Sequence, residues 1–169
     1  MVAFDASILI DALNPKLSGV RKLRIDLLLK TLADRRQKVI VPAPAFSEFL
    51  IGAASARGEY QKRIAQSSVF RVAAFDEVAA LECALLLSRV FSAKEQRGIT
   101  RTKIKFDWMI VSIAKTTPGV THLYAGDADI ARCATHAGVE SVHVDDLPVP
   151  AQSDWVDGGT TPTAGSTPD

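Results

Sequence analysis

Short β-type runs alternate with segments of helical periodicity along most of this chain, and that alternation limits its possible folds more than any other feature. The β-type runs lie at 2–4, 39–41, 69–73, 121–125 and 140–144, and the helical patterns at 20–36, 44–55, 77–91, 107–116 and 127–136. Such alternation favours an α/β fold, because parallel strands need a crossover segment between them. We therefore predict an α/β fold with a mainly parallel sheet.

The composition divides the chain into one domain and a tail. Residues 1–148 are enough for a single domain with its own core. Residues 149–169 are rich in Pro, Gly, Ser and Thr, with three aspartates and no lysine or arginine, so we predict a disordered tail. No apolar run approaches a membrane span, no basic segment precedes the apolar N-terminus, and the two cysteines indicate no disulfide framework. We expect a cytoplasmic protein without a membrane partner.

Two aspartates follow predicted strands, where ligands of open α/β sheets are bound. Asp5 comes directly after the first strand, and Asp127 follows the strand at 121–125 across Gly126. Asp127 could instead cap the helix that begins after it. A carboxylate that ends a buried strand, as Asp5 does, is harder to explain by structure alone.

Two further acids lie on predicted helices. Asp107 begins a helix on the same face as Ile110, so its side chain is expected to point toward the body of the protein. Glu48 lies between Ala45 and Ile51 at helical spacing and borders an apolar face. Asp107 could gain only from the positive end of its helix, and Glu48 could be a solvated residue. A charge on a core-facing stripe is nevertheless costly unless it is paired or bound to metal.

Other catalytic patterns are missing from the sequence. The three histidines show no zinc spacing, and there is no CxxC, no glycine-rich phosphate loop and no GxSxG. Oxygen-only ligand sets suit Mg²⁺ or Mn²⁺, and such a cation lowers the pKa of a bound water. The acids therefore indicate a site for a divalent cation.

Four segments around these acids resemble the acidic motifs of PIN domains, and most closely those of VapC-type toxin ribonucleases from bacterial toxin–antitoxin modules. The segments are FDASILIDAL, SEFL, KFDWMIVSIA and YAGDADIARCA, and the resemblance runs from residue 2 to 144. It implies a three-layer α/β/α PIN-like fold with a short, mainly parallel central sheet over residues 1–148. It also implies the catalytic acids Asp5, Glu48, Asp107 and Asp127, the metal ligands Asp5, Asp107, Asp127 and Asp129, and a supporting hydroxyl on Ser7.

One motif departs from the family pattern. Ala125 stands where the fourth motif commonly has threonine, and Ile130 stands where it commonly has phenylalanine. Loss of the threonine hydroxyl would loosen the hold on Asp127, although both aspartates of the motif are present.

The resemblance implies an Mg²⁺- or Mn²⁺-dependent endoribonuclease that is the toxin of a toxin–antitoxin pair and acts on RNA. It also implies that the protein forms a homodimer and binds a small antitoxin protein. Arg97, Arg101, Lys103 and Lys105 precede Asp107 and could follow an RNA backbone, or could belong to a solvated loop. One alternative is a catalytically idle PIN-like scaffold. Another is a haloacid-dehalogenase-type phosphatase, which usually has a second aspartate where this chain has Ser7.

Overall fold

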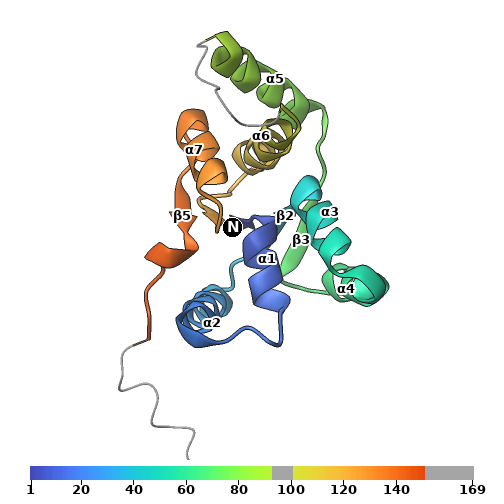
Figure 1. The fold of residues 1–169 in the computed structure, drawn as a ribbon, viewed down its shortest axis with the longest axis vertical. Helices are drawn as coiled ribbons and strands as arrows, with labels where there is room; N and C mark the ends of the chain where they lie inside the picture. Colours follow the sequence, from blue (N-terminus) through green and yellow to red (C-terminus); the bar gives the residue numbers. More distant parts are fainter. Residues whose placement is uncertain (93–100, 151–169) are drawn as a thin grey trace, which may run out of the picture.

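Five short strands form one parallel sheet at the centre of the molecule (Figure 1). The computed structural model describes residues 1–92 and 101–150, and the predicted tail lies outside these residues from position 151 onward. In the order β3-β2-β1-β4-β5, every neighbouring pair is parallel, which confirms the predicted sheet. The strands are β1 (Val2–Phe4), β2 (Val39–Pro42), β3 (Phe70–Ala73), β4 (Leu123–Ala125) and β5 (Ser141–His143).

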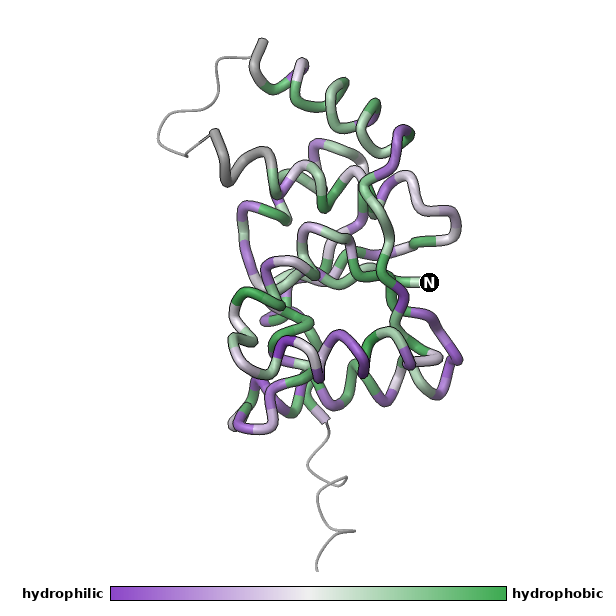
Figure 2. Tube along the Cα trace, turned by 90° about the vertical axis from the view of Figure 1, so that its right-hand side faces the viewer, coloured by the Kyte–Doolittle hydropathy of each residue, from purple (hydrophilic) through white to green (hydrophobic). Residues whose placement is uncertain are grey.

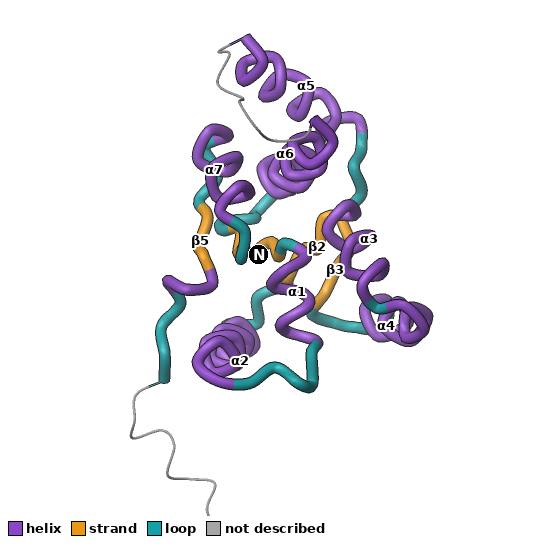
Figure 3. The backbone as a smooth tube through the Cα atoms, viewed as in Figure 1, coloured by secondary structure: helices purple, strands orange, loops and turns teal. Residues whose placement is uncertain are grey.

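Helices cover both faces of this sheet and complete the predicted three-layer α/β/α arrangement (Figure 3). One face carries α5, α6 and α7, and the other carries α1 and α2, while α3 and α4 lie beside the β2 and β3 edge (Figure 1). The helices are α1 (Ala6–Leu13), α2 (Gly19–Asp34), α3 (Ala43–Gly52), α4 (Arg57–Ala65), α5 (Glu77–Ser92), α6 (Arg101–Thr116) and α7 (Ala128–Ala137), with short 3₁₀ turns at Ala54–Ala56 and Val144–Asp146.

The central strands β1 and β2 are buried on both faces because they send alternate side chains into two cores. Ala3 and Ile40 join the core under α5, α6 and α7, whereas Phe4 and Val41 join the core under α1 and α2. The chain leaving the N-terminus is accordingly coloured as hydrophobic in Figure 2. Among the described residues, no helix is both long and apolar enough to cross a membrane.

Three helices differ from the predicted pattern. Two of them, α1 and α4, were not predicted: the apolar run of α1 is too short for its periodicity to separate helix from strand, and α4 is mostly polar, with only Ile64 buried. The prediction that Asp107 begins a helix is wrong, since α6 starts at Arg101. Its first turns read RTKIKF, and this basic stretch resembles a loop in composition although Lys, Arg and Ile are all tolerated in helices.

Candidate active site

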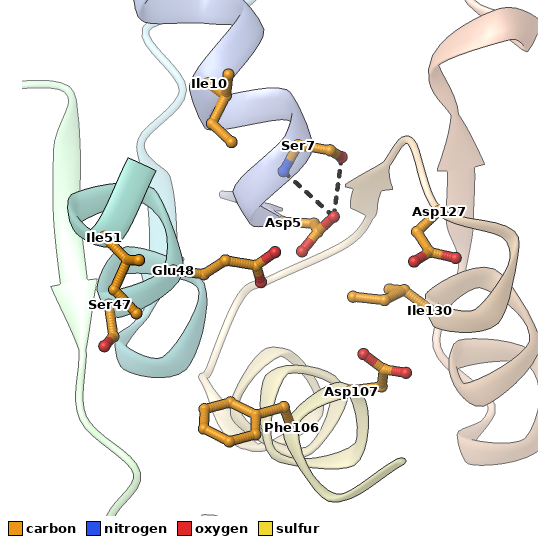
Figure 4. A pocket seen from close by; sticks show the side chains of 10 residues that line it. All are labelled: Asp5, Ser7, Ile10, Ser47, Glu48, Ile51, Phe106, Asp107, Asp127 and Ile130. Atoms are coloured by element: carbon orange, nitrogen blue, oxygen red, sulfur yellow. Dashed lines mark hydrogen bonds between the residues drawn. The ribbon is translucent and has the colours of Figure 1, made fainter. Parts of the chain in front are cut away.

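A pocket of about 530 Å³ lies where β1 and β4 end, and it collects the four predicted catalytic acids (Figure 4). The acids come from four separate parts of the chain: the ends of β1 and β4, and the helices α3 and α6. In Figure 4 their side chains stand around one open space. The lining residues are Asp5, Ser7, Ile10, Ser47, Glu48, Ile51, Phe106, Asp107, Asp127 and Ile130.

Asp5 is fixed by the turn between β1 and α1. It is the N-cap of α1, and its Oδ2 accepts hydrogen bonds from the Ser7 hydroxyl at 2.9 Å and the Ser7 amide at 3.4 Å. The side chain is buried, with a relative exposure of 4%. Burial raises the pKa of this carboxyl, hydrogen bonds from Ser7 and the backbone oppose that rise, and the nearby charge of Asp127 adds to it. A bound cation would offset the cost of keeping the buried carboxylate charged.

Asp127 occupies the corresponding position after β4. It is the N-cap of α7, where its Oδ1 accepts a hydrogen bond from the Asp129 amide at 2.8 Å. The structural explanation considered from the sequence is therefore correct, but Asp127 also lines the pocket. The Gly126 amide donates to the Ser7 hydroxyl at 2.8 Å, so the turn is tied to its neighbour even though Ala125 lacks the hydroxyl common in the family.

Asp107 faces the pocket from the interior of α6. It is buried at 7% exposure, as are Ile110 and Val111 on the same helix, which confirms the predicted core-facing orientation. Because α6 begins six residues before Asp107, the positive end of the helix no longer accounts for an acid at this position. A buried carboxylate in mid-helix is costly unless it is paired or bound to a cation, and that of Asp107 lines the pocket.

Glu48 reaches into the same space from α3 (Figure 4). The predicted apolar face around it is only half formed: Ala45 is buried, but Ile51 is 71% exposed and Glu48 itself is exposed. Glu48 thus belongs to the rim of the pocket and not to a core-facing stripe.

The other predicted site residues lie farther from the pocket or outside the described side chains. Asp129 is not among the lining residues, and its carboxylate pairs with Arg132 at 3.0 Å. The helix α6 includes Arg101, Lys103 and Lys105 in its first turns, but their side chains lie outside the described part of the structure, as does Arg97 altogether. The pocket therefore unites Asp5, Ser7, Glu48, Asp107 and Asp127.

The donor set of the pocket fits a hard divalent cation. Its polar lining consists of carboxylates and hydroxyls, without histidine or cysteine. Within the described ranges, no three acidic, histidine or cysteine side chains already meet closely enough to hold an ion. Binding of a cation would therefore require carboxylates to turn toward a common point in the pocket.

An apolar wall was not predicted from the sequence. Phe106 is 47% exposed beside Asp107, and Ile10 and Ile51 also line the pocket while remaining exposed. The aromatic side chain on the other side of Asp107 is placed differently, since Trp108 is 2% exposed and packs in the core. Its place directly before an inward-facing acid could have indicated that Phe106 lies near the mouth of the pocket.

Comparison with solved structures identifies the fold. The complex described as FitAB bound to a DNA fragment matches with a TM-score of 0.62 at 20% identity, covering 88% of this chain and 98% of that chain. VapBC2 from Rickettsia felis, bound to a DNA fragment from its promoter, matches with a TM-score of 0.59 at 13% identity, covering 85% and 98%. The chain has the PIN-domain fold.

A third solved structure matches the same fold. VapC20 of Mycobacterium tuberculosis, described as a Sarcin-Ricin loop cleaving toxin, has a TM-score of 0.56 at 16% identity, covering 78% of this chain and 94% of that chain. No family model and no curated protein matches the sequence. At these identities the likeness shows the PIN fold, and the acid-lined pocket must carry any statement about chemistry.

Proposed function

We propose that this PIN-fold protein is a divalent-metal-dependent endoribonuclease and the toxin of a toxin–antitoxin pair. The observation that carries the proposal is the convergence of Asp5, Glu48, Asp107 and Asp127 on one pocket from four parts of the chain. Two of these acids, Asp5 and Asp107, are buried. Buried carboxylates that share a pocket repel one another, and a cation relieves that repulsion.

Each acid has a role that follows from its position. Asp5, Asp107 and Asp127 would hold Mg²⁺ or Mn²⁺, which when bound supplies an activated water and neutralises charge on the phosphate. Exposed Glu48 would orient the attacking water from the opposite wall of the pocket. Ser7 fixes Asp5 through its hydroxyl, and Asp129 supports Asp127 through its backbone amide and could add a carboxylate oxygen.

The direct test is cleavage of RNA by the purified full chain with Mn²⁺ or Mg²⁺. We expect wild-type protein to cut, EDTA to stop the reaction, and Asp107→Asn to reduce the rate by more than about 100-fold, because removing even supporting groups costs 10–100-fold. Asp34→Asn, an exposed acid at the end of α2, is the matched control and should cut normally. Wild-type protein that cuts no RNA, or Asp107→Asn that cuts equally well, would overturn the proposal.

The phosphatase alternative finds no second acid where it needs one. Ser7 occupies that position, and its hydroxyl is engaged by Asp5 and the Gly126 amide. A catalytically idle scaffold with the same fold would cut no RNA in the cleavage test. That single experiment therefore separates the ribonuclease from the idle scaffold.

The proposed toxin would act in the cytoplasm as a homodimer and would be neutralised by a small antitoxin protein. Support for the antitoxin comes from FitAB and VapBC2, because these solved structures are complexes of a toxin with its antitoxin, bound to DNA. Expression should arrest growth, and Asp5→Ala should relieve the arrest. Light scattering that finds only monomer at micromolar concentration would contradict the dimer, and normal growth of cells that produce soluble wild-type protein would contradict the toxin role.

A further inference from the structure

An arginine on α2 reaches the turn that precedes Asp127. The Nε of Arg21 donates to the Asp11 carboxylate at 2.6 Å, and this contact joins α2 to the end of α1. The Asp11 side chain is 11% exposed and the Arg21 side chain is 39% exposed. Asp11 thus anchors one edge of the guanidinium, while part of the Arg21 side chain remains open to solvent.

The position of Gly126 reveals where the guanidinium lies. A Cβ at residue 126 would come within 2.9 Å of Arg21 Nη2 and within 2.9 Å of Ser7 Oγ. The backbone of Gly126 is not in the left-handed region, so glycine is needed here for space and not for its conformation. The absent side chain allows Arg21 to pack against the turn, next to the hydroxyl that binds Asp5.

This placement puts a fixed positive charge at the edge of an acidic pocket. A polyanionic backbone is repelled by the acids unless cations guide its phosphates. Arginine presents five N–H donors in a planar fork that matches a phosphate. Asp11 accepts from Nε, so the Nη groups provide the donors for a phosphate. Partial exposure of the side chain gives a ligand access to it.

We propose that Arg21 forms a phosphate subsite, which binds a backbone phosphodiester of the RNA beside the one that is cut. Asp11 positions the guanidinium, and Gly126 provides the space that brings it next to Ser7 and Asp127. The proposal rests on the proposed ribonuclease function for its substrate. It adds a binding residue that lies outside the lining of the acidic pocket.

The test compares Arg21→Gln with Lys22→Gln, which removes the same charge from the next residue of α2. Lys22 pairs with Asp26 at 2.7 Å and is exposed, so it controls for the change in net charge. Binding of a single-stranded RNA oligonucleotide is measured by fluorescence anisotropy over a series of salt concentrations, in EDTA so that no RNA is cut. We expect Arg21→Gln to weaken binding by about tenfold and to reduce the salt slope by about 0.7, the value for one phosphate contact on a single strand.

Cleavage kinetics with Mn²⁺ then separate binding from structure. For Arg21→Gln we expect a higher KM with little change in kcat, and partial recovery in Arg21→Lys, which restores the charge without the planar fork. Equal KM and equal salt slope in Arg21→Gln and Lys22→Gln would overturn the subsite. A fall in kcat and in melting temperature with unchanged KM would also overturn it, by assigning Arg21 a purely structural contact.

Failure of the subsite can be distinguished from failure of the ribonuclease proposal. If wild-type protein cuts RNA and Asp107→Asn does not, the nuclease stands whatever Arg21→Gln does. If wild-type protein cuts nothing, the anisotropy measurement still decides whether Arg21 binds a phosphate. Binding without cleavage that depends on Arg21 would support the subsite alone, and binding that ignores Arg21 would overturn it.

Discussion

The turns after β1 and β4 both present an aspartate that caps a helix, but they hold it in different ways. The sequences are similar, Asp-Ala-Ser at the first turn and Asp-Ala-Asp at the second. Asp5 is buried and accepts hydrogen bonds from both the hydroxyl and the amide of Ser7. Asp127 is only partly buried and accepts from the amide of Asp129 at its cap, while the Asp129 carboxylate turns to Arg132.

The difference shows that the first turn supports the second. The Ser7 hydroxyl donates to Asp5 and accepts from the Gly126 amide, so one side chain fixes both strand ends relative to each other. The Asp5 amide also donates to the carbonyl of Tyr124 on β4 at 3.0 Å. The second turn has Asp129 where the first has Ser7, and it has no hydroxyl at Ala125, so its hydroxyl contact comes from Ser7.

The largest expected effect is from Asp5→Asn. Asparagine is as good an N-cap as aspartate, so the fold should be kept while the charge for metal is lost. We expect RNA cleavage to fall by more than about 100-fold, and by more than in Asp127→Asn, because buried Asp5 is the more rigidly placed of the two.

The control for this substitution is Asp76→Asn, which changes another capping aspartate, at the start of α5 and away from the pocket. Its activity and melting temperature should remain close to wild type. If Asp127→Asn lost more activity than Asp5→Asn, the proposed difference between the turns would be reversed.

Removal of the shared hydroxyl should have the next largest effect. Ser7→Ala leaves the Gly126 amide and Asp5 Oδ2 each without one hydrogen-bond partner. We expect the free energy of unfolding to fall by about 1–3 kcal/mol, and cleavage to fall by about 10–100-fold because both strand-end acids lose support. Urea unfolding and steady-state cleavage measure the two effects.

Ser47→Ala provides the matched comparison, since Ser47 lines the same pocket but is exposed on α3. A surface substitution of this kind should change stability by no more than about 0.5 kcal/mol. Equal losses from Ser7→Ala and Ser47→Ala would mean that the bridge between the turns is unimportant.

The strand-end acids were predictable because their positions follow from topology. Parallel strands end at the same edge of a sheet, so Asp5 and Asp127 were expected at that edge, and they lie near each other because β1 and β4 are neighbouring strands. Helical spacing likewise placed Asp107 toward the interior. It misplaced the start of α6, because a basic stretch such as RTKIKF has no apolar stripe that separates helix from loop.

The contacts between the turns were not predictable in the same way. They join residues far apart in the sequence, such as Ser7 with Gly126 and Arg21 with the same glycine. Nothing in local periodicity records a hydroxyl that serves two turns, or a glycine retained for the space it leaves. The helix α1, which Asp5 caps, was also missed, and without it the capping role of Asp5 could not be inferred.

The pH dependence of stability should also distinguish the first turn, because Asp5 is buried in the metal-free protein. Burial raises the pKa of this carboxyl above its ordinary value of 3.8, so the folded state holds the proton more tightly than the unfolded chain. The resulting stability is fully present below the unfolded pKa and is lost as pH rises through the folded pKa. Relative to Asp5→Asn, wild-type protein in EDTA should therefore become less stable as pH rises above about 4.

Urea unfolding of both proteins at a series of pH values measures this difference. Added Mn²⁺ should reverse the trend for wild type, since a cation that binds only the folded state stabilises it by an amount that grows with the cation concentration. A stability difference that stays constant with pH, or that grows in favour of wild type, would show that Asp5 is not destabilised by burial.

The smallest expected effect is from Asp129→Asn, at the position of the second turn that matches Ser7. Its carboxylate pairs with Arg132 in an exposed i,i+3 contact, and its backbone amide would still donate to Asp127. We expect a stability change within about 0.5 kcal/mol and a loss of cleavage below about tenfold. A loss as large as that of Asp5→Asn would mean that Asp129 leaves Arg132 and binds the metal directly, so that the second turn contributes two acids where the first contributes one acid and a hydroxyl.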